Sequence, residues 1–294
     1  HWGAHRPALF VVLMQLFPSF ERFGELAADS GVVPVYREFL FDVDTAVTAY
    51  AKLAEPPFGF LLESVVGGEQ WARYSFLGTR PRSAWRLQKG QVSVWTPEVG
   101  WMDVEVDDPL ADLDARLRAE QPANMEGLPR FWGGAVGYFS YDIIREIEHL
   151  PSAPPDDLDL PDGLFVFTDI VLAIDNLKGR AMAISAVPVP KAADEGELRA
   201  LYNAAAERTA DVVRRLAEAP APSPLSLAPE PDEDPPFTSS TTRLAFEAGV
   251  ERVGEYVRAG DAFQVVLSQR LSLPLDSTPF DLYRGLRSLN PSPY

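Results

Sequence analysis

The sequence predicts an α+β fold with large antiparallel sheets and flanking helices. Three observations support this fold class. Short apolar runs with strand-like alternation recur between residues 58 and 187, and turn residues separate them. Two pairs of runs are joined by short turns, at Lys89–Gly90 and at 176–180, which is typical of antiparallel neighbours. Amphipathic segments with helical spacing lie before and after this region.

The first predicted elements are two helices with a strand between them. We expect the first helix to begin after Ser19, because a serine hydroxyl satisfies the free backbone N–H groups of a helix start, and Phe23 lies on its apolar face. The run 32–36 is predicted as a strand. Asp44 is expected to cap the second helix, which ends before Pro56.

The central region is predicted to be mainly β structure. Its strands share apolar alternation or short apolar runs bounded by turn residues. They cover 58–66, 74–78, a hairpin over 85–94, 131–141, 164–175 and 181–187. A short helix is predicted from Pro109, since the first helical position needs no N–H. We expect Gly133, Gly134 and Gly137 to permit close backbone packing, because no phosphate-binding loop pattern surrounds them.

The chain is predicted to have four parts. They are an upstream extension that is not native (1–13), an amino-terminal domain (14–219), a proline-rich linker (220–240) and the start of an incomplete second domain (241–294). A long helix over 197–219 closes the first domain. Seven prolines between Pro220 and Pro236 indicate the linker.

The second domain is predicted to contain two helices and a strand. The first helix carries apolar residues at helical spacing from Phe246 to Val257, and the strand covers 263–273. Thr278 is expected to cap the second helix. Three leucines on one face of that helix are expected to be buried, namely Leu282, Leu286 and Leu289.

Composition excludes several classes of function. A net charge of -17 opposes binding to a phosphate backbone, so we expect no nucleic-acid partner. The absence of cysteine and the presence of only three histidines argue against disulfides, thiolate metal sites and histidine-based triads. No apolar run reaches the roughly 18 to 20 residues that cross a bilayer, so we expect no membrane span and a cytoplasmic protein.

Two short stretches place polar groups at unusual positions. In Leu61-Leu62-Glu63-Ser64, strand alternation puts the Ser64 hydroxyl on the same face as Leu62 and the Glu63 carboxylate on the opposite face. A half-buried serine beside a solvated glutamate is common in strands, so alone this stretch indicates no site. In Asn290-Pro291-Ser292-Pro293-Tyr294, two prolines hold the backbone extended just after a helix.

Together with further motifs, these stretches resemble anthranilate synthase component I from about residue 17 to residue 294. The other motifs are Arg73-Tyr74-Ser75-Phe76-Leu77-Gly78, Gly133-Gly134-Ala135-Val136-Gly137-Tyr138 and Gly260-Asp261-Ala262-Phe263-Gln264-Val265-Val266-Leu267-Ser268-Gln269-Arg270. The order of five motifs along the chain makes a chance match implausible. The resemblance implies an amino-terminal α+β domain followed by a chorismate-binding domain.

The resemblance also implies a pocket for L-tryptophan, the feedback inhibitor of the family. The Leu-Leu-Glu-Ser strand and the Asn-Pro-Ser-Pro-Tyr segment meet there, so Ser64, Pro293 and Tyr294 are expected to contact the inhibitor, with Glu63 as a neighbour. A free amino acid presents an ammonium, a carboxylate and here an indole, which suit hydroxyl or carboxylate partners and a flat apolar wall. Arg73 either adds a cation to this pocket or is a charge at a strand edge.

For catalysis, the resemblance implies that chorismate and ammonia become anthranilate and pyruvate with the help of Mg²⁺. We expect the catalytic residues and the Mg²⁺ ligands to follow Tyr294, so this chain contains no catalytic or metal-binding residue and is itself inactive. The resemblance implies a glutamine amidotransferase subunit as the source of ammonia, and hence a hetero-oligomer.

Two alternatives remain open. Aminodeoxychorismate synthase component I shares the implied fold and substrate, but it usually carries Asp rather than Glu before the serine that corresponds to Ser64. The other alternative is a regulatory module that binds tryptophan and has no activity. Finding acidic Mg²⁺ ligands and chorismate contacts after Tyr294 would exclude this second alternative.

Overall fold

The computed structural model describes residues 14–63, 73–226 and 236–291. The chain divides into two compact units. The first consists of residues 1–223 together with 290–294, and the second consists of residues 224–289. The division at residue 223 lies within the segment that the sequence indicates as a linker.

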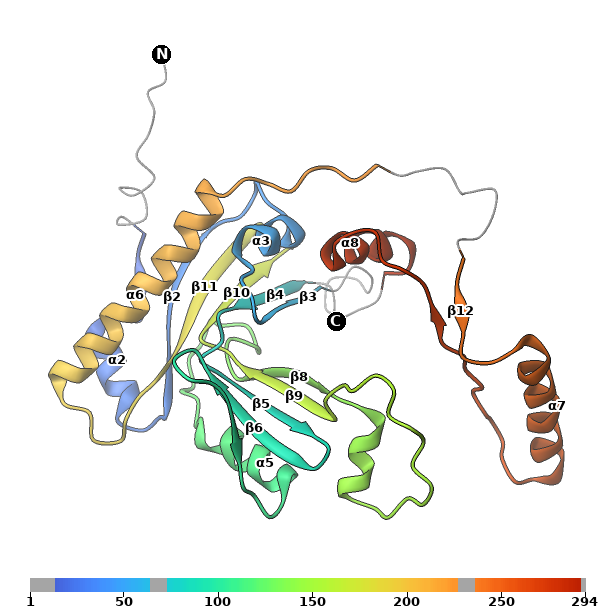
Figure 1. Cartoon of the computed structure of the whole chain (residues 1–294). Helices are drawn as coiled ribbons and strands as arrows, with labels where there is room; N and C mark the ends of the chain where they lie inside the picture. Colours follow the sequence, from blue (N-terminus) through green and yellow to red (C-terminus); the bar gives the residue numbers. More distant parts are fainter. Residues whose placement is uncertain (1–13, 64–72, 227–235, 292–294) are drawn as a thin grey trace. The chain divides into compact units, whose positions relative to one another are not determined.

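Two antiparallel sheets form the centre of the first unit (Figure 1). The six-stranded sheet has the order β1 (Leu16–Phe17), β2 (Val32–Leu40), β11 (Arg180–Pro188), β10 (Ile170–Asp175), β4 (Tyr74–Thr79) and β3 (Gly59–Leu62). The five-stranded sheet has the order β7 (Gly100–Val104), β6 (Gln91–Thr96), β5 (Ser83–Gln88), β9 (Gly163–Phe167) and β8 (Ala135–Phe139). The α+β prediction is confirmed.

Four α-helices and a 3-10 helix accompany these sheets among the described residues of the first unit. They are α2 (Phe20–Ala27), α3 (Ala46–Leu53), α5 (Pro109–Ala119), η1 (Tyr141–Glu146) and α6 (Glu195–Glu218). Ser19 caps α2 as predicted, because its hydroxyl accepts a hydrogen bond from the backbone N–H of Arg22 at 3.3 Å. A reciprocal capping box formed by Asp194 and Glu197 starts α6.

The predicted cap of α3 was wrong by one residue. Thr45 is the N-cap and forms a capping box with Thr48. Asp44 instead accepts a hydrogen bond from the Thr48 hydroxyl and pairs with Lys52 at 2.8 Å, in a nearly buried ion pair. The Lys52 ammonium also donates to the carbonyl of Leu216, so the pair ties α3 to α6.

The core lies on both faces of the six-stranded sheet. On one face, Leu172 and Ile174 of β10 belong to a cluster that includes Leu216 of α6. On the other face, Val171 and Ala173 belong to a cluster that the segment 125–132 closes. All six residues of β10 are therefore buried.

A separate core holds the five-stranded sheet against α5. Trp85 and Leu87 of β5 are fully buried beside Leu113 of α5. The indole N–H of Trp85 donates to the carboxylate of Asp112 at 2.9 Å, so the polar atom of this large side chain is satisfied. The predicted hairpin between β5 and β6 is confirmed, with positive φ at both Lys89 and Gly90.

One predicted strand is in fact two strands in different sheets. The apolar run 164–175 divides into β9 and β10 at Thr168 and Asp169. The neighbouring strands β4 and β5 divide at the same level, next to Pro81, which has no N–H for a ladder. The two sheets are thus joined by two strand pairs that pass from one sheet to the other.

Two other predicted strands are shorter in the structure, as judged from the residues that it describes. The run 58–66 contains β3 at Gly59–Leu62, and its last three residues lie outside the described residues. The run 131–141 contains β8 only over Ala135–Phe139, and η1 starts at Tyr141. The close packing expected of Gly137 is confirmed, because a Cβ there would lie 1.9 Å from the carbonyl oxygen of Leu164.

The second unit contains α7 (Arg243–Ala259), α8 (Pro279–Leu289) and a ladder of β12 (Thr238–Ser239) with β13 (Leu271–Ser272). The predicted strand 263–273 was wrong except for β13, since the described partner strand offers only two residues for pairing. The leucines of α8 expected to be buried are largely exposed, because no described segment of this unit covers that face.

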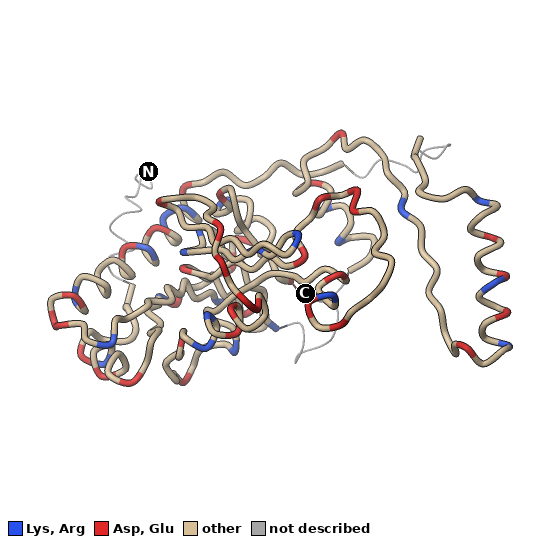
Figure 2. Tube along the Cα trace, turned by 60° about the horizontal axis from the view of Figure 1, so that its bottom comes forward, with Lys and Arg blue, Asp and Glu red and all other residues tan. Residues whose placement is uncertain are grey.

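Charged residues of both signs lie along α7, as Figure 2 shows. Ion pairs between residues three or four positions apart support this helix, for example Arg243 with Glu247 at 2.7 Å. Among the helices within the described ranges, none is both long and apolar enough to cross a membrane.

We predict that Gly137→Ala lowers the free energy of unfolding by about 2 kcal/mol or more, because the new methyl group must displace the backbone of β9. Gly24→Ala is the matched control, since nothing lies within 4 Å of a Cβ there. In helix α2 this control should stabilise by up to about 1 kcal/mol. Urea denaturation measures both, and equal effects of the two substitutions would contradict the packing role of Gly137.

Candidate functional site

The stretch expected to bind a ligand lies at the outer edge of the six-stranded sheet. β3 is the edge strand, and its Leu62 pairs in register with Phe76 of β4. Glu63 follows directly and is only 9% exposed, unlike the solvated glutamates that are common in such strands. A carboxylate is rarely buried without a structural or functional reason. Ser64 lies outside the described residues.

An ion pair closes the neighbouring corner of the sheet, where β4 begins. The Arg73 guanidinium donates to both oxygens of the Asp175 carboxylate, with a shortest distance of 2.6 Å. It also lies over the ring of Tyr74, 4.9 Å from its centre. The sequence left two interpretations of Arg73, a cation in the ligand pocket or a charge at a strand edge. The structure supports the second, because Asp175 at the end of β10 neutralises the Arg73 charge.

The environment of Asp175 stabilises its charged form. Burial would raise the pKa of this carboxyl, but hydrogen bonds from Arg73 and from the backbone N–H of Lys178 outweigh that effect. The pKa of Asp175 is therefore below its usual value. Sequence reasoning missed this residue, and its only local signal was an acidic side chain at the end of an apolar strand.

A cavity of about 80 Å³ lies beside this ion pair. Its walls are built by strand residues and by the β10–β11 turn, including Tyr74, Asp175 and Lys178. Glu38 and Arg180 close another side and pair with each other at 3.3 Å. The corner is thus a small polar hollow with charges of both signs at the edge of an otherwise apolar sheet.

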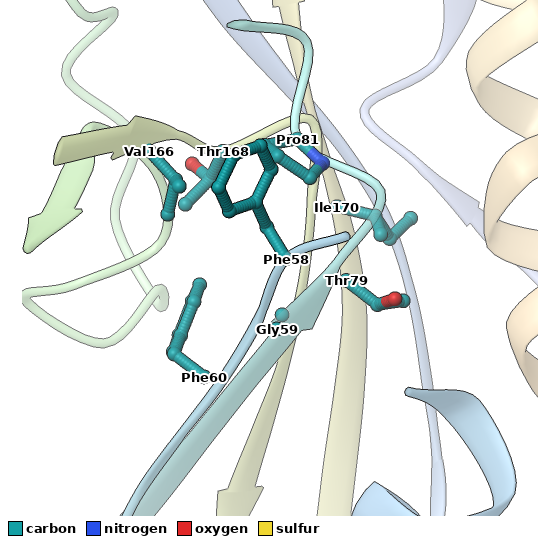
Figure 3. Close-up of a pocket in the computed structure, with 9 residues that line it drawn as sticks. Phe58, Gly59, Phe60, Thr79, Pro81, Val166, Thr168 and Ile170 are labelled. Carbon is teal, nitrogen blue, oxygen red and sulfur yellow. The ribbon is translucent and has the colours of Figure 1, made fainter. Parts of the chain in front are cut away.

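A second cavity lies where the two sheets join, and it is too small for a substrate. Figure 3 shows its lining side chains, including Phe58, Phe60 and Pro81. Its volume of about 10 Å³ admits at most about one water molecule. It is a packing defect between the sheets.

A larger cavity of about 350 Å³ lies beside α6. Four of its five charged groups are paired with each other, Arg80 with Asp211 at 2.7 Å and Arg208 with Asp169 at 3.3 Å, and Glu207 is the fifth. Burial raises the pKa of Asp169 even though Arg208 and other arginines oppose the shift. Because both arginines of the cavity are already paired with carboxylates, we assign no ligand to it.

The other half of the expected ligand site is described only in part. Asn290 and Pro291 follow α8, whereas Ser292, Pro293 and Tyr294 lie outside the described residues. The expected meeting of this segment with Ser64 therefore stays a prediction. Within the described part of the chain, no group of three or more His, Cys, Asp or Glu side chains is arranged to hold a metal ion.

Comparison with known proteins decides which family the chain represents. The model of the chorismate binding enzyme family matches residues 66–294. The chain belongs to this family. The match covers most of the chain and includes strands β4 to β11, which contain the whole five-stranded sheet, and the whole second unit.

Relatives with curated names carry the resemblance further. The chain is 40% identical to anthranilate synthase component 1 of Pseudomonas aeruginosa over 278 residues, which are 93% of this chain and 55% of the relative. It is 43% identical to the protein of the same name from Thermus thermophilus over 262 residues, which are 89% of this chain and 52% of the relative. The chain thus spans about half the length of these relatives.

A solved structure is similar as well. The crystal structure of anthranilate synthase component I from Streptococcus pneumoniae TIGR4 matches with a TM-score of 0.58 and 27% identity. The match covers 87% of this chain and 53% of that chain. The fold of this chorismate-binding enzyme family member therefore agrees with that of the anthranilate synthase component.

We predict that Asp175→Asn destabilises the protein most at neutral pH. The folded-state pKa of Asp175 is lowered, so its contribution to stability is fully present above the ordinary aspartate pKa of about 4 and is lost as the pH falls through the folded-state value. Urea unfolding of wild type and variant between pH 7 and pH 2 should show their difference shrinking. Asp114→Asn, which breaks the exposed pair with Arg118, is the control and should show little difference at any pH.

Proposed function

We propose that the complete protein carrying this chain is component I of an anthranilate synthase. Its reaction joins ammonia to the ring of chorismate with loss of the ring hydroxyl as water, and then releases pyruvate to leave anthranilate. One observation carries this proposal: identity of about 40% to proteins of that name extends along about nine tenths of the chain. Because the chain spans about half of these relatives, the activity is proposed for the complete protein.

The name of the relatives favours this function over aminodeoxychorismate synthase component I. The Glu63-Ser64 pair of this chain points the same way, since the alternative family usually has Asp before the serine. The regulatory-module alternative describes at most the chain taken alone, because the matched family is one of enzymes.

We further propose feedback inhibition by L-tryptophan at the edge of the six-stranded sheet. Ser64, Pro293, Tyr294 and Glu63 are the proposed contacts. The position of Glu63 supports this, because it directly follows the edge strand β3 and precedes Ser64, and a carboxylate can accept hydrogen bonds from an amino-acid ammonium group. The proposed regulation is allosteric, since it concerns a ligand other than the substrate.

Three further properties follow from the resemblance. Mg²⁺ is the proposed metal. The described residues hold no fitting cluster of ligands, so no step of the reaction is assigned to a residue of this chain through the metal. A glutamine amidotransferase subunit is the proposed partner and source of ammonia, because a protein called component 1 requires a second component. We place the resulting hetero-oligomer in the cytoplasm.

We predict that the complete protein forms anthranilate from chorismate, ammonia and Mg²⁺, and uses glutamine only when the amidotransferase subunit is added. The fluorescence of anthranilate follows the reaction, and chromatography identifies the products. Equal amounts of pyruvate and anthranilate should appear. An aminated product that keeps its pyruvyl group would instead support aminodeoxychorismate synthase.

We predict that Ser64→Ala in the complete protein weakens tryptophan binding roughly tenfold to a hundredfold, because a hydrogen bond to a charged ligand group is worth about 1.5 to 3 kcal/mol. Turnover without tryptophan should change little. Ser30→Ala is the matched control, since Ser30 lies next to the opposite end of the six-stranded sheet. Calorimetric titration measures both, and wild-type affinity in Ser64→Ala would remove Ser64 from the site.

A further inference from the structure

A long connection between β8 and β9 forms a separate projection of the first unit, made of residues 140–162. Figure 1 shows it extending beyond the five-stranded sheet, with a short helix in its first half. The backbone N–H of Ser140 donates to the carbonyl of Asp162 at 2.8 Å, which holds the two ends of the projection together. We call this segment the 140–162 projection.

Large apolar side chains on and beside this projection are exposed to solvent. They are Tyr141 (80% exposed), Ile147 (65%), Leu158 (56%), Leu160 (60%) and, at the end of β8, Tyr138 (43%) and Phe139 (46%). A single exposed leucine is ordinary, but such a group on one segment is typical of a surface that another molecule covers. Aromatic residues in particular supply much of the binding energy of protein interfaces.

The same projection is strongly acidic. Its seven carboxylates belong to Asp142, Glu146, Glu148, Asp156, Asp157, Asp159 and Asp162, and its only arginine is Arg145. That arginine pairs with Asp142 at 2.6 Å, and Lys89 from the β5–β6 turn pairs with Asp159 at 2.6 Å. Within the described ranges, neither Glu146 nor Glu148 has a cationic partner. Carboxylates and exposed apolar side chains therefore occur together on the 140–162 projection.

Internal contacts hold the projection in a defined shape. Arg145 donates to the carbonyl of Leu150 at 2.8 Å, and the Asp156 carboxylate accepts from the backbone N–H groups of Leu158 and Asp159. Prolines restrict the backbone at four further positions, namely Pro151, Pro154, Pro155 and Pro161. A segment ordered before binding loses less conformational entropy when a partner docks.

We propose that the 140–162 projection is the docking surface for a partner protein that presents an apolar socket bordered by lysine and arginine. The partner is the amidotransferase subunit, and this choice rests on the proposed function. A second copy of this chain is disfavoured, because two acidic projections would face each other and the net charge of each chain is -17. Anionic lipid surfaces and nucleic acids are repelled for the same reason.

The test measures binding of the complete protein to its amidotransferase subunit by calorimetry and by association kinetics at several salt concentrations. Tyr141→Ala and Ile147→Ala should each weaken binding about tenfold or more, mainly through faster dissociation. Glu146→Lys should slow association and reduce its dependence on salt. Activity with ammonia should stay unchanged in all three variants, whereas activity with glutamine should fall at limiting partner concentration.

The β6–β7 turn supplies matched controls, because it lies at the opposite end of the five-stranded sheet from the projection. Val99 is 62% exposed and Glu98 is exposed, so Val99→Ala and Glu98→Lys repeat the chemical changes at a distant place. Both controls should bind like wild type. Circular dichroism and thermal unfolding establish that every variant is folded.

Three outcomes overturn the proposal, and they have different meanings. If wild type does not bind the amidotransferase subunit, the proposed partner of the whole enzyme is wrong. If wild type binds and all three projection variants bind within twofold of it, the partner stands but this docking surface is wrong. If hydrogen exchange shows residues 141–160 already protected without the partner, another part of the complete protein covers the projection.

Discussion

The burial of β10 on both of its faces is the constraint on which the six-stranded sheet depends. Its side chains alternate between a cluster closed by α6 and a cluster closed by the segment 125–132. Helices α3 and α6 and this segment therefore pack on the same strand. The strand also pairs with β11 and β4, which in turn pair with β2 and β3, and β1 is joined to β2.

The end of β10 explains the chemistry of the candidate site. Asp175 is the last residue of this buried strand, and it carries a charge that Arg73 and the backbone N–H of Lys178 stabilise. The same edge of the sheet carries Glu63, where β3 ends next to β4. A buried sheet that ends in compensated charges offers polar partners beside apolar walls, which is what a free aromatic amino acid requires.

The two proposed binding regions lie on different sheets of one unit. The tryptophan region belongs to the six-stranded sheet, whereas the 140–162 projection extends from the five-stranded sheet. The strand pairs β4–β5 and β10–β9 pass from one sheet to the other at Pro81 and Asp169. Arg82 strengthens this passage by donating to the carbonyl of Thr168 and to Glu120. The two strand pairs that pass between the sheets therefore connect both proposed binding regions.

Local chemistry alone determined the fold class, the cap at Ser19, the turn at Lys89–Gly90 and the motifs that indicate the family, because each depends on neighbours in sequence. The break of the run 164–175 was decided by tertiary structure, since apolar alternation is the same on both sides of it. The pairing of Arg73 with Asp175 joins residues 102 positions apart, which no local pattern reveals. Burial of Glu63 likewise depends on packing around the sheet edge, and the roles of Ser64, Pro293 and Tyr294 stay predictions from sequence. Sequence periodicity records which residues avoid water, but only the paired and packed chain decides what covers them.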